Sequence, residues 1–347
     1  MASADASANR SGYAAGVVMV LLAGTVWSMM GLGVRFMENA SPLQILLYRS
    51  LGMIPALTIF IAIRHGGRLD RALYQTGTAT IIGGLMLVFA FTGSIVSLKE
   101  TTVANAVFLL ATAPFFAAIL GRIVLGEKVR LVTWIMIVVG LSGVAIMVYD
   151  GLSAGKVIGN VAGLVCAMFF AIFTIAMRME TRGDSLTAVL LGGIFASIAS
   201  AVAIAVAGQP LVLSWHDTAI AVVLGIGALG LGLVLYALGS RHVPAAESTL
   251  LAMTEVVLSP IWVWLVFGET AGVLMLVGGS ILLSALFANA ITGVVRERRA
   301  SRDRAPAGAL TGHGNGHAAS PPRVAPRVVP GYAVAAPRAT ARATRQP

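Results

Sequence analysis

Residues 101–120 read TTVANAVFLLATAPFFAAIL and contain no Asp, Glu, Lys or Arg. A bilayer core about 30 Å thick requires roughly 20 apolar residues in a membrane-spanning helix, so this stretch is long enough to cross it. Similar stretches recur along the chain as far as Val295. They predict an all-α integral membrane protein with ten transmembrane helices, at about 13–35, 43–63, 74–97, 101–120, 131–148, 157–177, 187–207, 218–239, 245–267 and 272–293.

The composition of the 347-residue chain agrees with this prediction, because 58% of its residues are hydrophobic and only 11% are charged. Its mean hydropathy of +0.90 is too high for a soluble enzyme with a polar surface. The one cysteine, Cys166, excludes an intramolecular disulfide and a multi-cysteine metal site. The five histidines lie in predicted loops or near the C-terminus, and no Gly-rich phosphate loop precedes Lys and Ser or Thr. We therefore expect no metal site, no cofactor, no direct use of ATP and no enzymatic activity.

Most of the positive charge belongs to the C-terminal end of the chain. Residues 296–347 hold ten Arg and two acids, Glu297 and Asp303, which leaves +8 of the formal net charge of +10. From about residue 300 onward Pro, Ala, Gly and Arg dominate, which predicts a disordered tail over 300–347. This tail could bind anionic lipid, associate with RNA or anchor the topology, and we expect no specific nucleic-acid partner.

Positive residues are distributed unevenly between the predicted loops. If the N-terminal segment 1–12 is cytoplasmic, fifteen Lys and Arg lie in cytoplasmic segments, and three, Arg35, Lys99 and Lys156, lie in the opposite loops. Lys and Arg are retained on the cytoplasmic side of a membrane. We therefore predict a multi-pass protein of the inner (plasma) membrane with both termini in the cytoplasm.

The two halves of the chain are weakly similar when they are aligned on a repeated Gly-Glu pair. Placing Gly126-Glu127 over Gly268-Glu269 also aligns Ala104 with Ala246 and Thr112 with Thr254. Each half contains five predicted helices, so equivalent loops of the two halves lie on opposite sides of the membrane. The halves are therefore predicted to be inverted repeats, an arrangement that supports alternating access.

The repeated segments resemble the C-terminal part of an EamA-type repeat of the drug/metabolite transporter superfamily. The first copy carries Ser97-Leu98, Val103-Ala104-Asn105-Ala106, Pro114 and Leu125-Gly126-Glu127, and the second carries Val243-Pro244-Ala245-Ala246, Thr254-Glu255, Pro260 and Phe267-Gly268-Glu269. Trp27-Ser28 and Arg49 also fit the family pattern. The resemblance implies two inverted five-helix repeats, at 13–148 and 157–293, around a central cavity lined mainly by helices 1, 3, 4, 6, 8 and 9.

One position departs from the family pattern. Such repeats often place Pro directly after the Glu of the ninth helix, whereas four residues separate Glu255 from Pro260 here. Because Pro removes a helix hydrogen bond, Pro114 and Pro260 are predicted helix breaks, and the break in the ninth helix is expected one turn later than usual. Simple packing kinks are the alternative for both prolines.

Glu255 is the leading candidate for a functional residue, because charge at the membrane centre costs at least about 2.5 kcal/mol. It lies ten residues after Ala245, which is roughly 15 Å into the membrane. We predict that it binds a substrate ammonium or carries a coupling proton; the alternative is a protonated or hydrogen-bonded acid that ties two helices together. Arg49 could neutralise a substrate carboxylate or pair with Glu255, and its alternatives are a structural contact or snorkelling to the headgroups.

A larger set of side chains offers aromatic faces or neutral hydrogen-bonding groups at cavity depth. Its members are Trp27, Ser28, Asn105, Thr112, Phe170, Thr174, Tyr236, Ser248 and Trp262. Bundle packing is the alternative for each of them. Asn105 and Ser248 occupy nearly equivalent positions in the two halves, so a shared cavity would make them paired donors. Glu127 and Glu269 are expected to orient short connections between helices rather than to contact substrate.

These features together predict a secondary transporter that exports a small metabolite through a midplane pocket. An amino-acid-like compound is favoured because Glu255 and Arg49 could address opposite charges. Protons are the simplest driving ion, and facilitated diffusion is the alternative. Two other functions stay open: a flippase for a lipid-linked substrate and a non-transporting membrane interaction subunit. The sequence predicts no oligomeric state.

Overall fold

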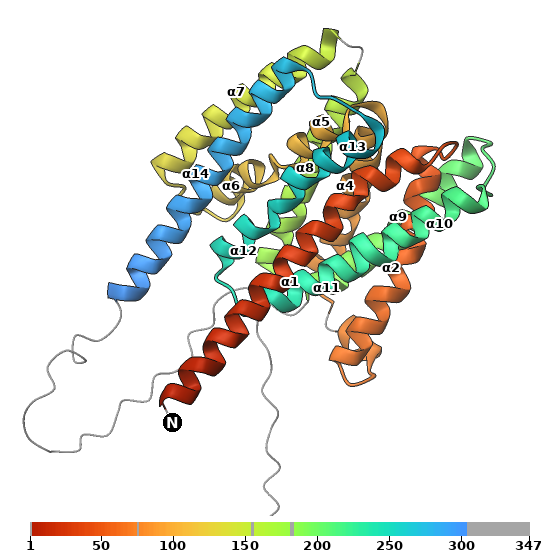
Figure 1. Cartoon of the computed structure of the whole chain (residues 1–347). Helices are drawn as coiled ribbons and strands as arrows, with labels where there is room; N and C mark the ends of the chain where they lie inside the picture. Colours follow the sequence, from red (N-terminus) through yellow and green to blue (C-terminus); the bar gives the residue numbers. More distant parts are fainter. Residues whose placement is uncertain (1, 75, 154–155, 181–183, 304–347) are drawn as a thin grey trace, which may run out of the picture.

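The computed structural model describes residues 2–74, 76–153, 156–180 and 184–303, and these residues form helices and connections without a β-strand. Ten helical spans in this part of the chain are long and apolar enough to cross a membrane (Figure 1). They are α1 (Ala2–Phe36), α2 (Pro42–Arg64), α4 (Thr78–Glu100), α5 with α6 (Val103–Leu110, Ala113–Val124), α7 (Leu131–Ser153), α8 (Val157–Met179), α9 (Ser185–Val206), α10 with η1 and α11 (Trp215–Leu224, Gly225–Leu231, Gly232–Gly239), α12 with α13 (Ala245–Ala252, Thr254–Phe267) and α14 (Val273–Asp303). A short helix, α3 (Leu69–Tyr74), lies in the connection between α2 and α4.

Successive spans alternate in direction, which defines two faces of the bundle. We call the face at which α1 begins the N-terminal face, and the face at which α1 ends, at Phe36, the opposite face. The fourth span, α5 with α6, therefore begins at the opposite face, and the ninth span, α12 with α13, begins at the N-terminal face. Equivalent segments of the two five-helix repeats thus lie at opposite ends of the molecule.

The spans pack closely where small residues meet. Gly143 in α7 lies against the backbone of Gly278 in α14, and Gly84 in α4 lies against the backbone of Gly192 in α9. Small side chains let the backbones of membrane helices approach, so that van der Waals contacts replace the hydrophobic drive available in water. The α7 and α14 helices lie side by side at one edge of the bundle (Figure 1).

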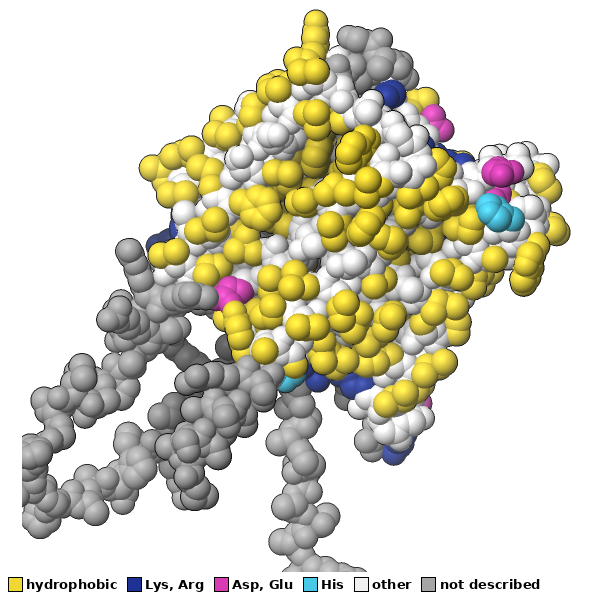
Figure 2. Space-filling model, in the orientation of Figure 1, with side chains coloured by type: hydrophobic (Ala, Val, Ile, Leu, Met, Phe, Trp, Pro, Cys, Tyr) yellow, Lys and Arg dark blue, Asp and Glu magenta, His cyan; other side chains and the backbone are white. Residues whose placement is uncertain are grey.

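The outer surface of the bundle is apolar, as expected for a surface in contact with lipid tails. Hydrophobic side chains cover most of the visible face (Figure 2). Large apolar residues such as Ile59, Val138 and Trp264 are more than half exposed. In water such a surface would aggregate, whereas a bilayer solvates it.

Polar contacts join the ends of the spans at each face. At the N-terminal face, Arg64 at the end of α2 forms an ion pair with Asp184, which caps α9. At the opposite face, the Gln44 side chain in α2 donates a hydrogen bond to the carbonyl of Pro210, at 2.6 Å. Both contacts connect the first repeat to the second, so the repeats are fastened to each other at both ends.

The terminal boundaries differ from the sequence predictions. The first helix begins at Ala2 instead of residue 13, because the polar segment 1–12 continues the same helix from residue 2. The last helix continues to Asp303, so the first four residues of the predicted tail are helical. The rest of the predicted disordered tail, 304–347, lies outside the described residues.

Candidate functional site

The fourth and ninth spans are both interrupted at the same position of the repeat. The first segment of the fourth span ends at Leu110, and the first segment of the ninth span ends at Ala252, which the repeat alignment pairs with Leu110. A threonine hydroxyl donates to a backbone carbonyl at each break, from Thr112 to Leu109 and from Thr254 to Leu251, both at 2.6 Å. Such short-range bonds compete with the regular helix ladder and expose backbone groups near the membrane centre.

The break in the ninth span corrects one prediction from the sequence. The expected break one turn beyond the family position, at Pro260, is wrong, because Pro260 lies inside the continuous helix α13. The break falls at Met253, before Glu255, where the Val256 amide donates to the Met253 carbonyl at 3.0 Å. Pro114 stands in the first turn of α6, where its missing N–H removes no helix hydrogen bond.

Glu255 occupies the first turn of α13, directly after the break. It lies ten residues after the start of α12 and twelve before the end of α13, so it is near the middle of the span. Its side chain is partly buried, and it forms no hydrogen bond or ion pair with any residue that the structure describes. A helix N-terminus favours a negative charge, but an unpaired carboxylate at this depth is costly and is available to a ligand.

Arg49 is buried inside the bundle instead of reaching the headgroups. Only 2% of its surface is exposed, so the snorkelling alternative is wrong. Its guanidinium lies 5.1 Å from the centre of the Phe91 ring, and Nη1 lies 3.9 Å from the Met30 sulfur. Within the described residues, its Nε and Nη2 atoms have no hydrogen-bond partner. A buried cation with unsatisfied donors is unfavourable unless an anion or water completes its contacts.

Glu255 and Arg49 do not pair with each other. Both lie along the same helix, because Gly24 of α1 lies against the backbone of Glu255, and Met30, six residues or about 9 Å later in α1, contacts the Arg49 guanidinium. Each of the two charged side chains can therefore bind a ligand group of the opposite charge. We see no group of three or more His, Cys, Asp or Glu in the described part of the chain that could hold a metal ion.

The α1 helix forms a wall of the site beside the break. A Cβ atom added at Gly24 would lie 3.5 Å from the backbone nitrogen of Glu255, so α1 passes directly over the start of α13. Trp27 and Ser28 lie one turn later on the same face of α1. The Trp262 indole donates to the Ser28 hydroxyl at 2.9 Å, and the rings of Trp27 and Tyr236 are 5.5 Å apart.

Two predicted site residues, Asn105 and Ser248, lie toward the ends of the bundle, away from this region. Asn105 is buried near the opposite face, where its amide donates to Thr101 at 2.9 Å and to Asn160. Ser248 is buried near the N-terminal face, in α12. The two residues therefore cannot be paired donors of one cavity, because inversion places equivalent positions at opposite ends. Thr174 in α8 donates to the carbonyl of Phe170, one turn earlier in the same helix.

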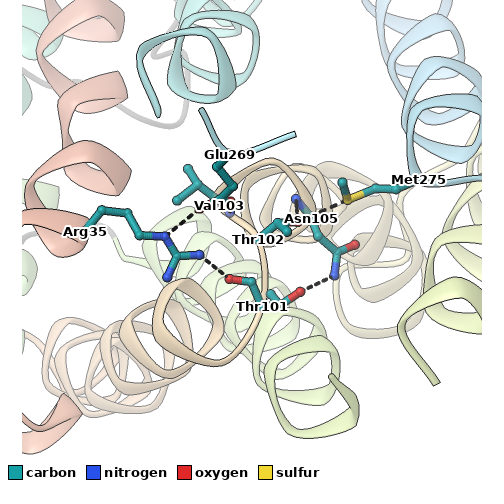
Figure 3. Close-up of polar contacts among 7 residues, drawn as sticks. All are labelled: Arg35, Thr101, Thr102, Val103, Asn105, Glu269 and Met275. Atoms are coloured by element: carbon teal, nitrogen blue, oxygen red, sulfur yellow. Dashed lines mark hydrogen bonds and ion pairs between the residues drawn. The ribbon is translucent and has the colours of Figure 1, made fainter. Parts of the chain in front are cut away.

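A polar network that the sequence did not predict joins the end of α1, the start of α5 and the connection after α13 at the opposite face (Figure 3). Glu269 accepts hydrogen bonds from Arg35 Nε and from the Val103 amide, each at 2.7 Å, and Arg35 Nη2 donates to the Thr101 carbonyl at 2.6 Å. The sequence signal for Glu269 was its place in the repeated Gly-Glu pair, but nothing in the sequence connected it to Arg35.

A pocket of about 380 Å³ lies beside this network, between α5, α13 and α14. Val103, Pro260, Trp264 and Glu269 are among its lining residues. Glu255 does not line this pocket. The pocket is therefore separate from the region around Glu255 and Arg49.

Comparisons with known proteins identify a family, related transporters and a solved structure of the same fold. The sequence model described as the EamA-like transporter family matches residues 14–149 and 157–291. The pseudopaline exporter CntI of Pseudomonas aeruginosa is 28% identical over 292 residues, covering 79% of this chain and 95% of that protein. An uncharacterized transporter of Archaeoglobus fulgidus is 28% identical over 227 residues, covering 65% of this chain and 78% of that protein. One solved crystal structure shares the fold at 18% identity, with a TM-score of 0.57 over 78% of this chain and 95% of its own.

Proposed function

This chain belongs to the EamA-like transporter family, and we propose that it exports a small amino-acid-like metabolite by alternating access around Glu255 and Arg49. The single observation that carries the proposal is the unpaired carboxylate of Glu255 beside the mid-membrane helix break. An unpaired charge inside the membrane costs free energy, and binding a ligand of opposite charge or a proton removes that cost. The fold, with its inverted repeats, supplies two equivalent halves that can rock around such a site.

The two unpaired charges favour a substrate that carries both signs. An amino-acid-like compound would direct its ammonium toward Glu255 and its carboxylate toward Arg49 Nε and Nη2. Trp27, Tyr236 and Trp262 would contribute aromatic surface to the same ligand. The relative named as a pseudopaline exporter supports export of a metabolite as the direction.

Glu255 is also the candidate for proton coupling. When the carboxylate is protonated it loses its attraction for an ammonium group, so proton binding and substrate binding compete. Because both bind the same carboxylate, substrate leaving the cell would be exchanged for protons entering it. The uneven distribution of Lys and Arg supports an inner-membrane protein whose N-terminal face is cytoplasmic.

The experiment that tests this function is thermal unfolding of the detergent-purified protein against a panel of amino acids and related zwitterions. A ligand at 100 times its dissociation constant stabilises a protein by about 2.7 kcal/mol, which raises the unfolding temperature visibly. We expect the stabilisation to be much smaller in Glu255→Gln at the same ligand concentration. The matched control is Glu247→Gln, because Glu247 lies at the N-terminal face and accepts a hydrogen bond from Tyr13 at 2.7 Å.

Two results would contradict the proposal. The first is an equal stabilisation of the wild type and Glu255→Gln by the same zwitterion. The second is flux in proteoliposomes that keeps its rate and its pH dependence in Glu255→Gln. Stabilisation by lipid-linked compounds alone would instead favour a flippase.

A further inference from the structure

We propose that the network of Arg35 and Glu269 is a latch that holds the opposite face closed, and that Arg178 and Glu127 form the equivalent latch of the N-terminal face. We call them the opposite-face latch and the N-terminal latch. The proposal rests on the transport function above, because the latches would open and close in turn as the substrate site changes its access.

The two pairs occupy equivalent places in the inverted repeats. Glu127 and Glu269 are aligned with each other in the repeat, and each follows a glycine with positive φ, Gly126 at 66° and Gly268 at 64°. Their partners, Arg178 and Arg35, lie in the last turn of α8 and α1, the first helix of each repeat. Each pair therefore connects the first helix of one repeat to the connection between the fourth and fifth helices of the other.

The pairs differ in their surroundings. The Arg35 and Glu269 side chains are 22% and 21% exposed, and they hold the backbone of Thr101 and Val103 as well. Arg178 Nη1 donates to both carboxylate oxygens of Glu127, at 2.9 and 3.1 Å, but these side chains are 49% and 48% exposed. Charge-assisted bonds that are shielded from water are stronger than exposed ion pairs.

The opposite-face latch fastens three helices where they converge. One turn before Arg35, Gly31 of α1 packs against the Val103 side chain at the start of α5. A Cβ atom at Gly31 would also lie 3.0 Å from the Ser259 hydroxyl of α13. Glu269 thus joins the end of α13 to α1 and α5, one turn of α1 away from the point where Gly31 meets both helices.

The equivalent segments at the N-terminal face are covered less completely. Every residue from Val103 to Leu109 of α5 is buried. In α12, which is the equivalent of α5, the residues aligned with 105–109 are less buried: Ser248 is buried, Glu247, Leu250 and Leu251 are partly exposed, and Thr249 is exposed. The first residues of α5 are therefore covered more completely than the aligned residues of α12, which agrees with a tighter opposite-face latch.

The helix α13 connects the substrate region to the opposite-face latch. Glu255 lies in its first turn, and Glu269 follows its last residue, Phe267, by two positions. A helix transmits a shift along its length because its backbone bonds are internal, and the distance from residue 255 to 267 is roughly 18 Å at 1.5 Å per residue. Because α13 continues as one helix through Pro260, which removes one of its backbone hydrogen bonds, a change of charge or ligand at Glu255 can shift Glu269 along it.

The test measures access to the substrate region directly. Cys166→Ser removes the one cysteine, and Met253→Cys places a thiol two residues before Glu255 as the reporter while keeping the Thr254 hydroxyl at the break. An impermeant thiol reagent is added to the opposite face of oriented vesicles. We expect Glu269→Gln and Arg35→Gln each to accelerate labelling by about tenfold, the equivalent of 1.4 kcal/mol in the opening equilibrium. Glu269→Gln keeps an oxygen for the Val103 amide, so it removes the charge with little loss of structure.

The controls separate a latch from general loosening. Combining Arg35→Gln with Glu269→Gln should label no faster than either single variant, because both remove the same pair. Glu127→Gln should leave labelling from the opposite face unchanged or slower. Unchanged labelling in Glu269→Gln, additive effects in the double variant, or equal acceleration by Glu127→Gln would overturn the proposal. Labelling needs no substrate, so a failure of the export proposal would leave these outcomes readable.

Discussion

The two ends of the bundle are built from equivalent residues, yet they are closed to different degrees. At the opposite face, the pair of Arg35 and Glu269 is mostly shielded and holds two further backbone groups. At the N-terminal face, the pair of Arg178 and Glu127 is about half exposed. The repeated sequence determines which residues can meet, and the packing around them determines how tightly each face is held.

The largest expected effect comes from the residue between the two faces. Glu255→Gln removes the carboxylate without changing the volume of the side chain. We expect affinity for a zwitterion to fall by about 1.5–3 kcal/mol, or roughly 10- to 150-fold, because a hydrogen bond to a charged group is lost. Isothermal titration measures it, with Glu247→Gln as the control. Unaltered affinity would show that the two faces rock around some other residue.

The next largest effect is a loss of stability, which the same Glu-to-Gln substitution measures at each of the two faces. We expect Glu269→Gln to destabilise the protein by about 1–3 kcal/mol, since it leaves Arg35 partly buried without its anion. Glu127→Gln should cost less than about 1 kcal/mol, because that pair is exposed. Thermal unfolding in one detergent measures both. Equal losses would mean that the difference in exposure has no energetic consequence.

An effect of at most the same size is expected from filling the point where α1, α5 and α13 converge. Gly31→Ala would push a methyl group against Val103 and Ser259, and overpacking of this kind costs about 1–3 kcal/mol unless the neighbours move. We expect this variant to favour an open opposite face, which faster thiol labelling from that face would detect. Gly227→Ala is the matched control, because a Cβ atom there meets nothing within 4 Å. Identical behaviour of the two variants would contradict this packing account.

The smallest effect concerns salt. Exposed charges are screened at a Debye length of about 8 Å at physiological ionic strength, and shielded ones much less. Raising the salt concentration should therefore reduce the stability difference between the wild type and Glu127→Gln, and leave that of Glu269→Gln nearly unchanged. Melting temperatures over a salt series measure both differences. If salt reduced both stability differences equally, the two ion pairs would not differ in their shielding from solvent.

Much of the fold follows from patterns that are visible along the chain. The apolar stretches, eight of them uncharged and two interrupted by charge, predict the ten spans, which the structure confirms, and the repeated Gly-Glu pair with its aligned neighbours predicts the inverted repeats. Glu255 stands out because one carboxylate inside an apolar stretch has a large energetic cost. These signals are local or periodic, so they need no knowledge of which helices touch.

The features that sequence reasoning missed depend on contacts between distant residues. Arg35 and Glu269 are 234 positions apart, and no periodicity connects them. The burial of Arg49 depends on Phe91 and Met30 from two other helices. The position of the break at Met253 depends on a hydroxyl bond from Thr254 rather than on Pro260.

Because each ion pair takes one residue from each repeat, neither repeat can close a face alone. A single five-helix unit carries an Arg for one end of the bundle and a Glu for the other. It could form both ion pairs only with a second copy of itself that is inserted in the opposite orientation in the same membrane. Fusion of two oppositely oriented copies into one chain fixes their stoichiometry at one to one, and it leaves each copy free to adjust the strength of a single end.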